Sequence, residues 1–587
     1  MIHGSSSYAD LRSRVITHVR QIYPEQDADA LAERLLQTMG LDRHYSDPGH
    51  HRNRWDESDI LVITYADSIR QENETPLHTL HDFLTRHLAD TVSMVHILPF
   101  FPYSSDDGFA VMDYSQVNGS FGDWSDIEHI AGDFKLMSDL VINHCSGRSR
   151  WFDQFLRGEP PGSEYFIRVD ADTPLADVIR PRTGPLLRKV QRGDGEVHVW
   201  CTFSHDQPDL NFRNPDVLIE FVNIIRLYLE RGIRIFRLDA VAFLWKQPGT
   251  TCLNLPQTHE IVRLLRTLIE WHSGDALIIT ETNIPNRENL TYFGNANEAH
   301  MVYNFSLPPL LLYTLLTGNC HILKNWMMSL PPTITGTTYL NFIASHDGIG
   351  LRPIEDLLDH DEIDKLIHCM GRFGGHVSWR ALDNDESRPY EINISLFDAL
   401  KGTLDSDGDA DAWQEQRFIC AHTIMLALEG IPAFYIHSLF ATENDHEKFE
   451  STGKVRAINR RNWPRQVLET HLAGDTRHAR VFRELKRLIH IRRRQPAFHP
   501  NAARFNLHLS DEVFAFWRQG QNHNRDQSIY VLSNISPVAQ EIMLTELNLI
   551  PSDSWYDLVA GFTLSPDDTS LILKPYQSVW LTNRLPA

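Results

Sequence analysis

The stretch RIFRLDAVAFLW, residues 234–245, is an apolar run that contains an arginine and a carboxylate two positions apart, Arg237 and Asp239. Residues two apart in a β-strand project from the same face, so these two side chains would lie together. Burying a carboxylate is costly unless a cation or hydrogen bonds compensate, and we expect Arg237 to hold Asp239 ionised. The pattern is typical of a carboxylate nucleophile or electrostatic stabiliser, although a buried structural salt bridge would look the same.

Seven further short apolar runs, rich in β-branched and aromatic residues, accompany this one along the chain. They cover residues 59–67, 94–102, 136–144, 276–283, 301–309, 338–348 and 431–438. Segments with helical periodicity separate most of them, for example VLIEFVNIIRLYLERG at 217–232. Near-continuous apolar strands that alternate with helices are typical of a parallel sheet covered by helices. The sequence therefore predicts an α/β fold built on a (β/α)8 TIM barrel.

Two insertions interrupt this alternation, and the pattern changes again near the C-terminus. Alternating segments such as SIYVLSNIS predict antiparallel strands after residue 497. The expected organisation is an N-terminal helical extension at 1–57, a catalytic barrel at 58–144, 213–348 and 404–496, an inserted domain B at 145–212, an inserted loop-rich subdomain at 349–403 and a C-terminal antiparallel β domain at 497–587.

The formal net charge of −22 argues against a nucleic-acid partner, which would need a basic face, and against an anionic membrane surface. The chain has no apolar run of the ~20 residues that span a bilayer and no apolar signal-peptide core, so we expect a cytoplasmic protein. The six cysteines form no CxxC pair, and the acidic loop 405–411 lacks the glycine position of a calcium loop. We expect no metal and no cofactor, and both a monomer and a homodimer stay open.

Polar side chains gather at the C-terminal ends of the apolar runs, where barrels of this type build their active sites. Asp107 follows the second run, His144 ends the third, and Glu281 and Asp347 end the fifth and seventh. Glycoside cleavage needs one carboxylate at the anomeric carbon and a second carboxyl that protonates the leaving oxygen. The apolar strand before Glu281 would raise its pKa toward that of a general acid.

Short motifs in a fixed order carry a specific resemblance. They are DLVINH (139–144), QPDLN (207–211), RLDAV (237–241), ETN (281–283), ASHDG (344–348) and GIPAFYI (430–436). This series resembles the α-amylase clan of glycoside-active enzymes. Further matches resemble the clan's sucrose phosphorylase subfamily, at VITYAD (62–67), VHILPF (95–100), DDGF (106–109), RPR (180–182), PGTTC (248–252), HDGIG (346–350) and RAINR (456–460). The resemblance covers roughly residues 55–500 well and the C-terminal domain weakly.

The resemblance implies a retaining double displacement that transfers glucose from a small α-glucoside. It implies that Asp239 is the nucleophile, Glu281 the acid/base and Asp347 the transition-state stabiliser. It also implies a glucose subsite made of Asp107, Phe109, His144, Arg237, His346 and Arg456. Inorganic phosphate would act as co-substrate and give α-D-glucose 1-phosphate, which is the reaction of a glycosyltransferase-type phosphorylase.

A phosphorylase must bring a dianion close to carboxylates, which requires positive charge and hydrogen-bond donors. By the resemblance, Arg182 and Tyr390 contact phosphate, and Arg388 in the same loop as Tyr390 assists. The phosphate and acceptor subsites would be completed by Phe203, Gln207, Asn283 and Glu391. The rival class is a hydrolase or transglucosidase, which would be favoured if Arg182 and Tyr390 pointed away from the cleft. The three intact carboxylates argue against a non-catalytic binding module.

The departing acceptor is the least determined part of the reaction. The chain differs from plain sucrose phosphorylases in its N-terminal extension, in ETN where those have EVH, and in PYE where those have YQ. A neutral polyol suits Glu391, whereas the carboxylate of glycerate would need a cation, which Arg352 or Lys454 could supply. We therefore expect a 2-O-α-glucosylglycerol phosphorylase that releases glycerol. Glucosylglycerate phosphorylase is the alternative, followed by sucrose or sucrose 6′-phosphate phosphorylase.

Overall fold

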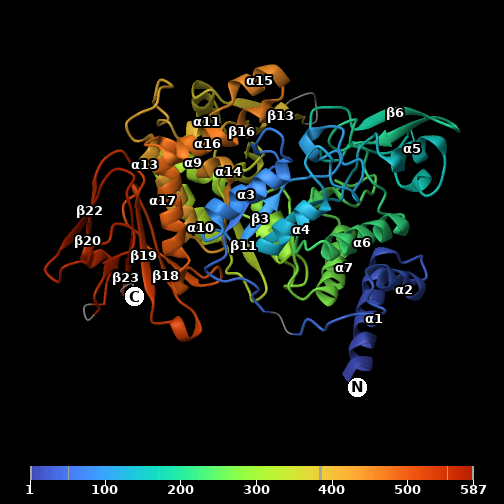
Figure 1. Cartoon of the computed structure of the whole chain (residues 1–587), viewed down its shortest axis with the longest axis horizontal. Helices are drawn as coiled ribbons and strands as arrows, with labels where there is room; N and C mark the ends of the chain where they lie inside the picture. Colours follow the sequence, from blue (N-terminus) through green and yellow to red (C-terminus); the bar gives the residue numbers. More distant parts are fainter. Residues whose placement is uncertain (1–2, 50–51, 171, 382–386, 551–552, 585–587) are drawn as a thin grey trace.

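A computed structural model describes residues 3–49, 52–170, 172–381, 387–550 and 553–584 (Figure 1). Within these residues the centre is a closed barrel of parallel strands: β1 (Leu61–Thr64), β3 (Met94–Ile97), β4 (Lys135–Val141), β8 (Ile235–Asp239), β9 (Leu277–Thr280), β10 (Met301–Tyr303), β11 (Thr338–Phe342) and β15 (Ile431–Tyr435). Each predicted apolar run supplies one strand, which confirms the (β/α)8 barrel. Almost every strand residue is buried, because side chains fill the barrel and helices cover it.

Helices cover the outside of the barrel. The longer ones are α3 (Pro76–Leu88), α4 (Trp124–Asp133), α6 (Pro215–Glu230), α7 (Pro256–His272), α9 (Leu307–Thr317), α13 (Gln414–Ala427) and α17 (Arg477–Arg492), and the shorter ones are α8 (Asn286–Asn289), α10 (His321–Ser329), α14 (Ile436–Leu439), α15 (His446–Thr452) and α16 (Arg465–Ala473). Helix α6 shows how the sequence specifies them. Its N-cap Asn214 accepts a hydrogen bond from the backbone N–H of Asp216. Its apolar face is buried at Val217, Phe221 and Ile225.

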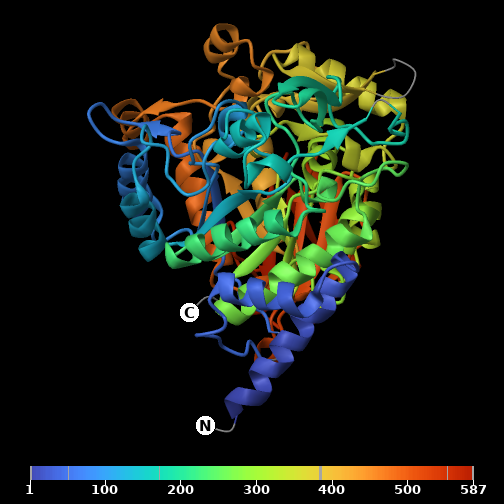
Figure 2. The ribbon, with the colours of Figure 1, turned by 90° about the vertical axis from the view of Figure 1, so that its right-hand side faces the viewer.

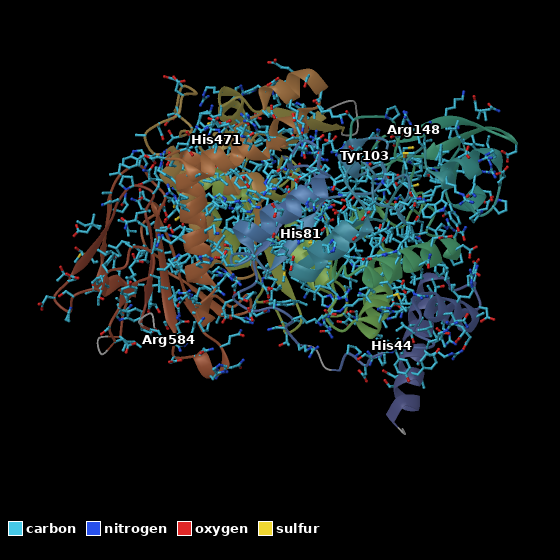
Figure 3. All side chains as sticks on the ribbon, in the orientation of Figure 1. His44, His81, Tyr103, Arg148, His471 and Arg584 are labelled. Atoms are coloured by element: carbon cyan, nitrogen blue, oxygen red, sulfur yellow. The ribbon has the colours of Figure 1, made fainter. Side chains whose placement is uncertain are left out.

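Polar contacts between surface side chains join neighbouring helices. His81 Nε2 on α3 lies 2.6 Å from Asp133 Oδ2 at the end of α4, and His81 is labelled near the centre of Figure 3. Arg231, just after α6, lies 2.6 Å from Glu128 on α4. Exposed contacts of this kind contribute about 0–1 kcal/mol each, so the barrel depends mainly on its apolar core.

Two N-terminal helices pack on the outside of the barrel. Helix α1 (His3–Ile22) contacts α7 and helix α2 (Ala28–Met39) contacts α6; Figure 2 shows the pair in dark blue against those green helices. Gly40 ends α2 in the left-handed conformation, with φ of 78°. His18 Nδ1 of α1 lies 2.6 Å from Glu260 Oε1 of α7, so a polar contact accompanies the apolar packing.

Both insertions carry a small antiparallel sheet. The first contains α5 (Arg150–Arg157), β5 (Arg168–Val169), β6 (Leu187–Arg192) and β7 (Gly195–Trp200), and the second contains β12 (Ile349–Gly350), α11 (His360–Arg372), β13 (His376–Ala381), β14 (Ser387–Asn393) and α12 (Leu396–Ala399). The sequence predicts a loop-rich second insertion, yet its described residues form the two helices α11 and α12 and a three-stranded sheet. A capping box at Asp359 and Glu362 starts α11, and Ile363 and Leu366 are buried on its inner face. A short parallel pair, β2 (Ile69–Arg70) and β16 (Trp463–Pro464), lies near the barrel rim.

Antiparallel sheets follow α17, as predicted for the C-terminal region. The larger sheet contains β17 (Ala503–Asn506), β18 (Val513–Gln519), β19 (Ser528–Asn534), β23 (Ser578–Thr582) and β21 (Tyr556–Asp557), and a second pairs β20 (Gln540–Met543) with β22 (Ser570–Leu573). Arg518 of β18 is fully buried and donates to the carbonyl oxygens of Ala427 and Ala502, which ties this region to the barrel. Among the described helices, none has both the length and the apolar character that crossing a bilayer requires.

Candidate active site

A cavity opens at the C-terminal ends of the barrel strands. It is lined by Asp106, Phe109, His144, Pro181, Arg182, Phe203, Gln207, Arg237, Asp239, Ala240, Phe243, Glu281, Thr282, Asn283, His346, Asp347, Arg352, Tyr390, Glu391 and Arg456. All but two of the predicted site residues line this cavity, and the two exceptions are Asp107 and Arg388. The fold therefore brings together side chains from the barrel strands and from both insertions.

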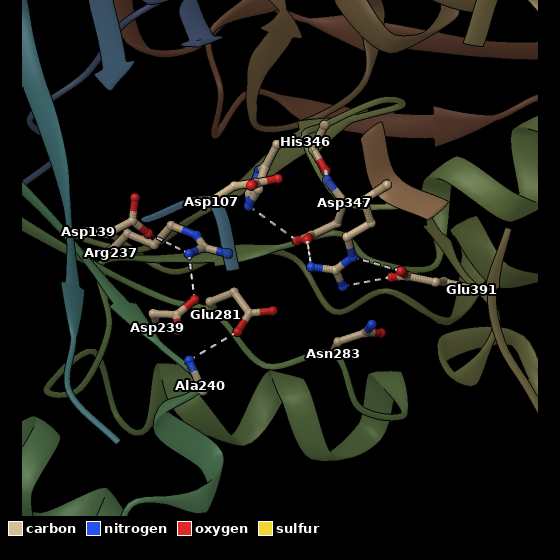
Figure 4. Close-up of polar contacts among 12 residues, drawn as sticks. Asp107, Asp139, Arg237, Asp239, Ala240, Glu281, Asn283, His346, Asp347 and Glu391 are labelled. Atoms are coloured by element: carbon tan, nitrogen blue, oxygen red, sulfur yellow. Dashed lines mark hydrogen bonds and ion pairs between the residues drawn. The ribbon is translucent and has the colours of Figure 1, made fainter. Parts of the chain in front are cut away.

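Asp239 is the last residue of β8, and its carboxylate faces Arg237 as the two-residue spacing predicts. Arg237 Nη1 lies 2.7 Å from Asp239 Oδ1, and the same nitrogen contacts the fully buried Asp139 (Figure 4). Burial raises the pKa of Asp239 well above its ordinary value, and Arg237 opposes this shift without overcoming it. The reason is that one guanidinium is shared between two carboxylates, which the sequence pattern alone did not reveal.

Glu281 directly follows β9 and lies beside the turn after Asp239. The backbone N–H of Ala240, a residue with a left-handed φ of 54°, donates to Glu281 Oε2 at 3.1 Å. Burial raises the pKa of Glu281, as predicted for a general acid. Two interacting carboxyls with raised pKa values titrate as a pair. The hydrogen bond from Arg237 favours the ionised form of Asp239, as a nucleophile requires.

Asp347, beyond the end of β11, has the opposite electrostatics. Its Oδ1 lies 2.6 Å from Arg456 Nη1, and its Oδ2 lies 3.4 Å from His346 Nε2. Burial alone would raise the pKa of Asp347, but Arg456, His346 and Arg460 together hold it well below its ordinary value. The cavity therefore contains a lasting negative charge, which suits the stabilisation of an oxocarbenium-like transition state.

An aromatic wall faces these carboxylates. The rings of Phe109 and His346 stack with centroids 5.3 Å apart and planes 7° from parallel. His144 Nε2 lies 3.2 Å from the carbonyl oxygen of Phe109 and 3.3 Å from Gln207 Nε2. Burial lowers the pKa of His346 to about 3 and also lowers that of His144. Both imidazoles are neutral near pH 7 and offer hydrogen bonds of the kind that sugar hydroxyls need.

Asp107 is not among the residues that line the cavity, so its contact with glucose stays a prediction. Its carboxylate pairs with Arg460 Nη1 at 2.5 Å and with Lys454 Nζ at 2.8 Å, and Arg460 also lies 3.9 Å from Asp347 Oδ1. Its neighbour Asp106 lines the cavity instead and accepts a hydrogen bond from Gln207 Nε2 at 3.0 Å. Both aspartates have positive φ, 54° and 49°, so the chain reverses between them and the two carboxylates face different sides.

The predicted phosphate residues Arg182 and Tyr390 lie together in the cavity. The Arg182 guanidinium carbon is 5.2 Å from the centre of the Tyr390 ring and 5.9 Å from that of Phe203. Asn283 Nδ2 donates to Tyr390 Oη at 3.3 Å. The condition that would favour a hydrolase, Arg182 and Tyr390 pointing away, is not met. Arg388 does not join them, because it sits at the outer end of β14 and stays exposed.

Glu391 is held in place by an arginine that compensates its charge. Arg456 Nε lies 2.8 Å from Glu391 Oε1, and Arg456 Nη2 lies 3.0 Å from Glu391 Oε2. Both oxygens of this buried carboxylate are therefore engaged, and the argument that Glu391 favours a neutral polyol no longer holds. Of the two cations considered for a carboxylate, Arg352 lines the cavity, whereas Lys454 pairs with Asp107 outside it.

Sequence reasoning missed several contributors to the site. The lining residues that it did not name as site residues are Asp106, Pro181, Ala240, Phe243, Thr282 and Arg352. It also gave no role to His96, whose Nε2 lies 2.7 Å from Asp139 Oδ2 behind Arg237. Most of these residues are sequence neighbours of predicted ones, so proximity in the chain was the signal that could have found them. Among the described residues, no group of His, Cys, Asp and Glu is arranged to hold a metal ion.

Behind His144, a buried lysine joins domain B to the barrel. Lys246 Nζ lies 2.6 Å from Asp209 Oδ2 and also contacts the side-chain oxygen of Asn143. Asp209 Oδ1 accepts from the backbone N–H of Thr202 at 2.8 Å. Its Oδ2 accepts from Thr202 Oγ1 at 2.6 Å and from Asn143 Nδ2 at 3.1 Å. This network fixes the wall that carries His144 and Gln207.

Comparison with known proteins adds a family to this geometry. The family described as "Alpha amylase, catalytic domain" matches residues 89–348. The chain is 40% identical over 580 residues to glucosylglycerate phosphorylase from Allomeiothermus silvanus, and the alignment covers 98% of this chain and 100% of that protein. It is 29% identical over 476 residues to glucosylglycerol phosphorylase from Marinobacter adhaerens, and that alignment covers 78% of this chain and 92% of that protein. The crystal structure of sucrose 6F-phosphate phosphorylase from Thermoanaerobacter thermosaccharolyticum matches with a TM-score of 0.70 at 26% identity, and the match covers 81% of this chain and 94% of that chain.

Proposed function

This chain belongs to the sucrose phosphorylase family of α-amylase-type glycoside phosphorylases, and on that premise we propose that it is a glucosylglycerate phosphorylase. Its reaction is the double displacement of that family, with inorganic phosphate as the second substrate. The observation that carries the choice of acceptor is the 40% identity over nearly the whole chain to a glucosylglycerate phosphorylase, against 29% to a glucosylglycerol phosphorylase. Glucosylglycerate phosphorylase, the alternative from the sequence, is thus better supported than glucosylglycerol phosphorylase, which was the first expectation.

In the first displacement, glucosylglycerate binds with its glucose against Phe109. Glu281 gives its proton to the glycosidic oxygen while an Asp239 oxygen attacks the anomeric carbon. The bond from that carbon to the leaving oxygen breaks, glycerate departs with the proton as a hydroxyl group, and a β-glucosyl-enzyme remains. The contact between Arg237 and Asp239 and the raised pKa of Glu281 support these roles, since Asp239 must be ionised and Glu281 protonated before the step.

In the second displacement, phosphate replaces glycerate. Glu281, now a carboxylate, takes a proton from the phosphate, and a phosphate oxygen attacks the anomeric carbon. The bond to Asp239 breaks, which regenerates the free enzyme and releases α-D-glucose 1-phosphate. Each step inverts the anomeric centre, so the net result is retention. The positive charge of Arg182, above the ring of Tyr390, supports a phosphate subsite among the carboxylates.

A hydrolase would carry out the first step identically and use water in the second. The observation that favours phosphate is the Arg182–Tyr390 pair inside the cavity, because water needs no cation. Arg182 has no carboxylate partner among the described residues, so its charge is available to an anionic substrate.

Parallel assays on the purified enzyme test the proposal. Glucosylglycerate, glucosylglycerol, sucrose and sucrose 6′-phosphate are each incubated with phosphate, and α-glucose 1-phosphate is measured. We expect kcat/KM to be highest for glucosylglycerate and turnover to depend on phosphate. Higher kcat/KM for glucosylglycerol would restore the first expectation. Release of free glucose at a similar rate without phosphate would identify a hydrolase.

A further inference from the structure

Two of the four arginines that line the cavity have no ion-pair partner among the described residues. Arg237 contacts Asp239 and the buried Asp139 behind it, and Arg456 contacts Asp347 and Glu391. The other two lining arginines are Arg182 and Arg352, and the lining carboxylates Asp106 and Glu281 are likewise in no ion pair among the described residues. Within the described part of the chain, neither of these two arginines donates a hydrogen bond or forms an ion pair. An active site that handles anionic substrates in succession would have this composition.

Arg352 is the more deeply buried of the two. Its residue is 8% exposed, and it begins the short 3-10 helix Arg352–Ile354 that follows β12. Burial lowers the pKa of Arg352, while the neighbouring Tyr390, Glu288 and Glu355 only partly oppose the shift. A guanidinium has five N–H donors, and those of Arg352 make no hydrogen bond among the described residues, so they are open to an anion in the cavity.

Asn283 offers a second unused polar atom on the same side of the cavity. Its Nδ2 donates to Tyr390 Oη, but its Oδ1 is buried and accepts no hydrogen bond within the described residues (Figure 4). The side chain lies against Gly350, two residues before Arg352, where a Cβ atom would come within 3.0 Å of Asn283 Oδ1. Gly350 therefore allows Asn283 to approach, and Oδ1 is a buried acceptor whose hydrogen bond is not supplied by the described residues.

From these two features we propose that Arg352 is the specificity-determining residue of the acceptor subsite. Its guanidinium pairs with the carboxylate of a small hydroxy acid, and Asn283 Oδ1 accepts a hydrogen bond from a free hydroxyl of the same molecule. The inference rests on the proposed function and extends it to the residues that select the acceptor. Glycerate has both a carboxylate and a hydroxyl left over after glucosylation. Glycerol would satisfy Asn283 but would leave Arg352 unpaired.

The variants Arg352→Gln and Arg352→Lys test this role, with Arg287→Gln as a matched control. Arg287 is an exposed arginine on α8 and does not line the cavity, so its substitution removes the same charge without touching the subsite. The measurement is kcat/KM with phosphate for glucosylglycerate and for glucosylglycerol, and the readout is the ratio of the two. We expect Arg352→Gln to lower this ratio by about 10–100-fold, the range for a hydrogen bond to a charged group. Arg352→Lys should give an intermediate ratio, because a lysine keeps the positive charge but cannot donate two parallel N–H hydrogen bonds to a carboxylate. The control should keep the wild-type ratio.

Asn283→Ala completes the test, because the hydroxyl that it binds is common to both acceptors. This variant should lower kcat/KM for glucosylglycerate and for glucosylglycerol by similar factors and leave the ratio of the two near that of the wild type. A merely structural role for Arg352, or a role in binding phosphate, would lower both donors equally in Arg352→Gln, and that result would overturn the inference. If Arg352→Gln does not fold, an unchanged ratio in Arg352→Lys would overturn it as well.

The failure of this inference differs from the failure of the proposed function. A wild-type enzyme that prefers glucosylglycerol would contradict the proposed function, whatever the variants do. A wild-type enzyme that prefers glucosylglycerate, together with an Arg352→Gln variant that keeps this preference, would contradict only the role of Arg352.

Discussion

Replacing Lys246 by Met should loosen the wall of domain B that borders the cavity. Lys246 is 3% exposed, and its partner Asp209 is completely buried, so the substitution leaves a buried carboxylate without its cation. Breaking a buried ion pair in this way typically costs about 3–5 kcal/mol. Asp209 keeps three hydrogen bonds, two from Thr202 and one from Asn143, which partly compensate its charge. We therefore expect the lower end of the range, about 3 kcal/mol.

Hydrogen exchange at Thr202 measures this cost directly. The amide N–H of Thr202 donates to Asp209 Oδ1, so its exchange reports the opening of this network. A loss of about 3 kcal/mol corresponds to an exchange rate about 100-fold faster when exchange follows the opening equilibrium. The assay follows the peptide that contains Thr202 by mass spectrometry, and a peptide from β19 serves as the internal control.

The double variant Lys246→Met/Asp209→Asn separates the charge from the packing. An amide at position 209 carries no charge to leave unpaired, so most of the protection of Thr202 should return. If Lys246→Met changes the Thr202 exchange rate less than about 3-fold, the ion pair does not hold domain B as argued. If the double variant exchanges as fast as the single one, the loss comes from the shape of the side chain and not from its charge.

Three further predictions concern the chemistry. Asp239→Asn should lower kcat by about 10⁴-fold or more. Because burial raises the pKa of Asp239, ionisation of this carboxyl destabilises the folded state as pH rises through the raised pKa. The melting temperature of the variant should therefore exceed that of the wild type by more at pH 7 than at pH 4. A variant that is less stable at both pH values would contradict this. Glu281→Gln should lower kcat/KM for glucosylglycerate by about 10²–10⁴-fold but lower kcat/KM for α-glucosyl fluoride far less, since fluoride leaves without a proton. In the wild type, the alkaline limb of the pH profile of kcat/KM should lie above the ordinary glutamate pKa, and this limb should vanish in the variant. Equal losses on both donors would remove Glu281 from the acid role. Arg182→Leu should reduce phosphate-dependent turnover about 10–100-fold more than hydrolysis in the absence of phosphate, and equal reductions would place Arg182 outside the phosphate subsite.

The barrel could be predicted because its strands follow a strong local rule. A parallel strand that is buried on both faces needs an almost unbroken apolar run, and runs such as 94–102 and 431–438 have that character. Helix α11 was missed although its sequence carries the capping box at Asp359 and apolar residues spaced for a helix. The local sequence therefore specifies this helix as well.

The site was predictable where a residue's role follows from its own strand and unpredictable where it follows from a distant partner. Glu281 follows an apolar strand, so its burial and raised pKa were expected. The sharing of Arg237 depends on Asp139 in the neighbouring strand, and nothing in the spacing of 234–245 indicates it. The choice between Asp106 and Asp107 depends on two positive φ values, which adjacent identical residues cannot reveal.

The acceptor shows most clearly why pairing in three dimensions decides specificity. A count of charged residues in the acceptor loops includes the acidic Glu391 and suggests a neutral polyol. Arg456, far away in the chain, neutralises Glu391 through two hydrogen bonds and so removes it from recognition. On the proposed function, Arg352, which has no ion-pair partner among the described residues, is then the cation that meets the carboxylate of the acceptor. For this chain, ion pairing between distant segments is therefore a better guide to the proposed acceptor than the composition of the loops.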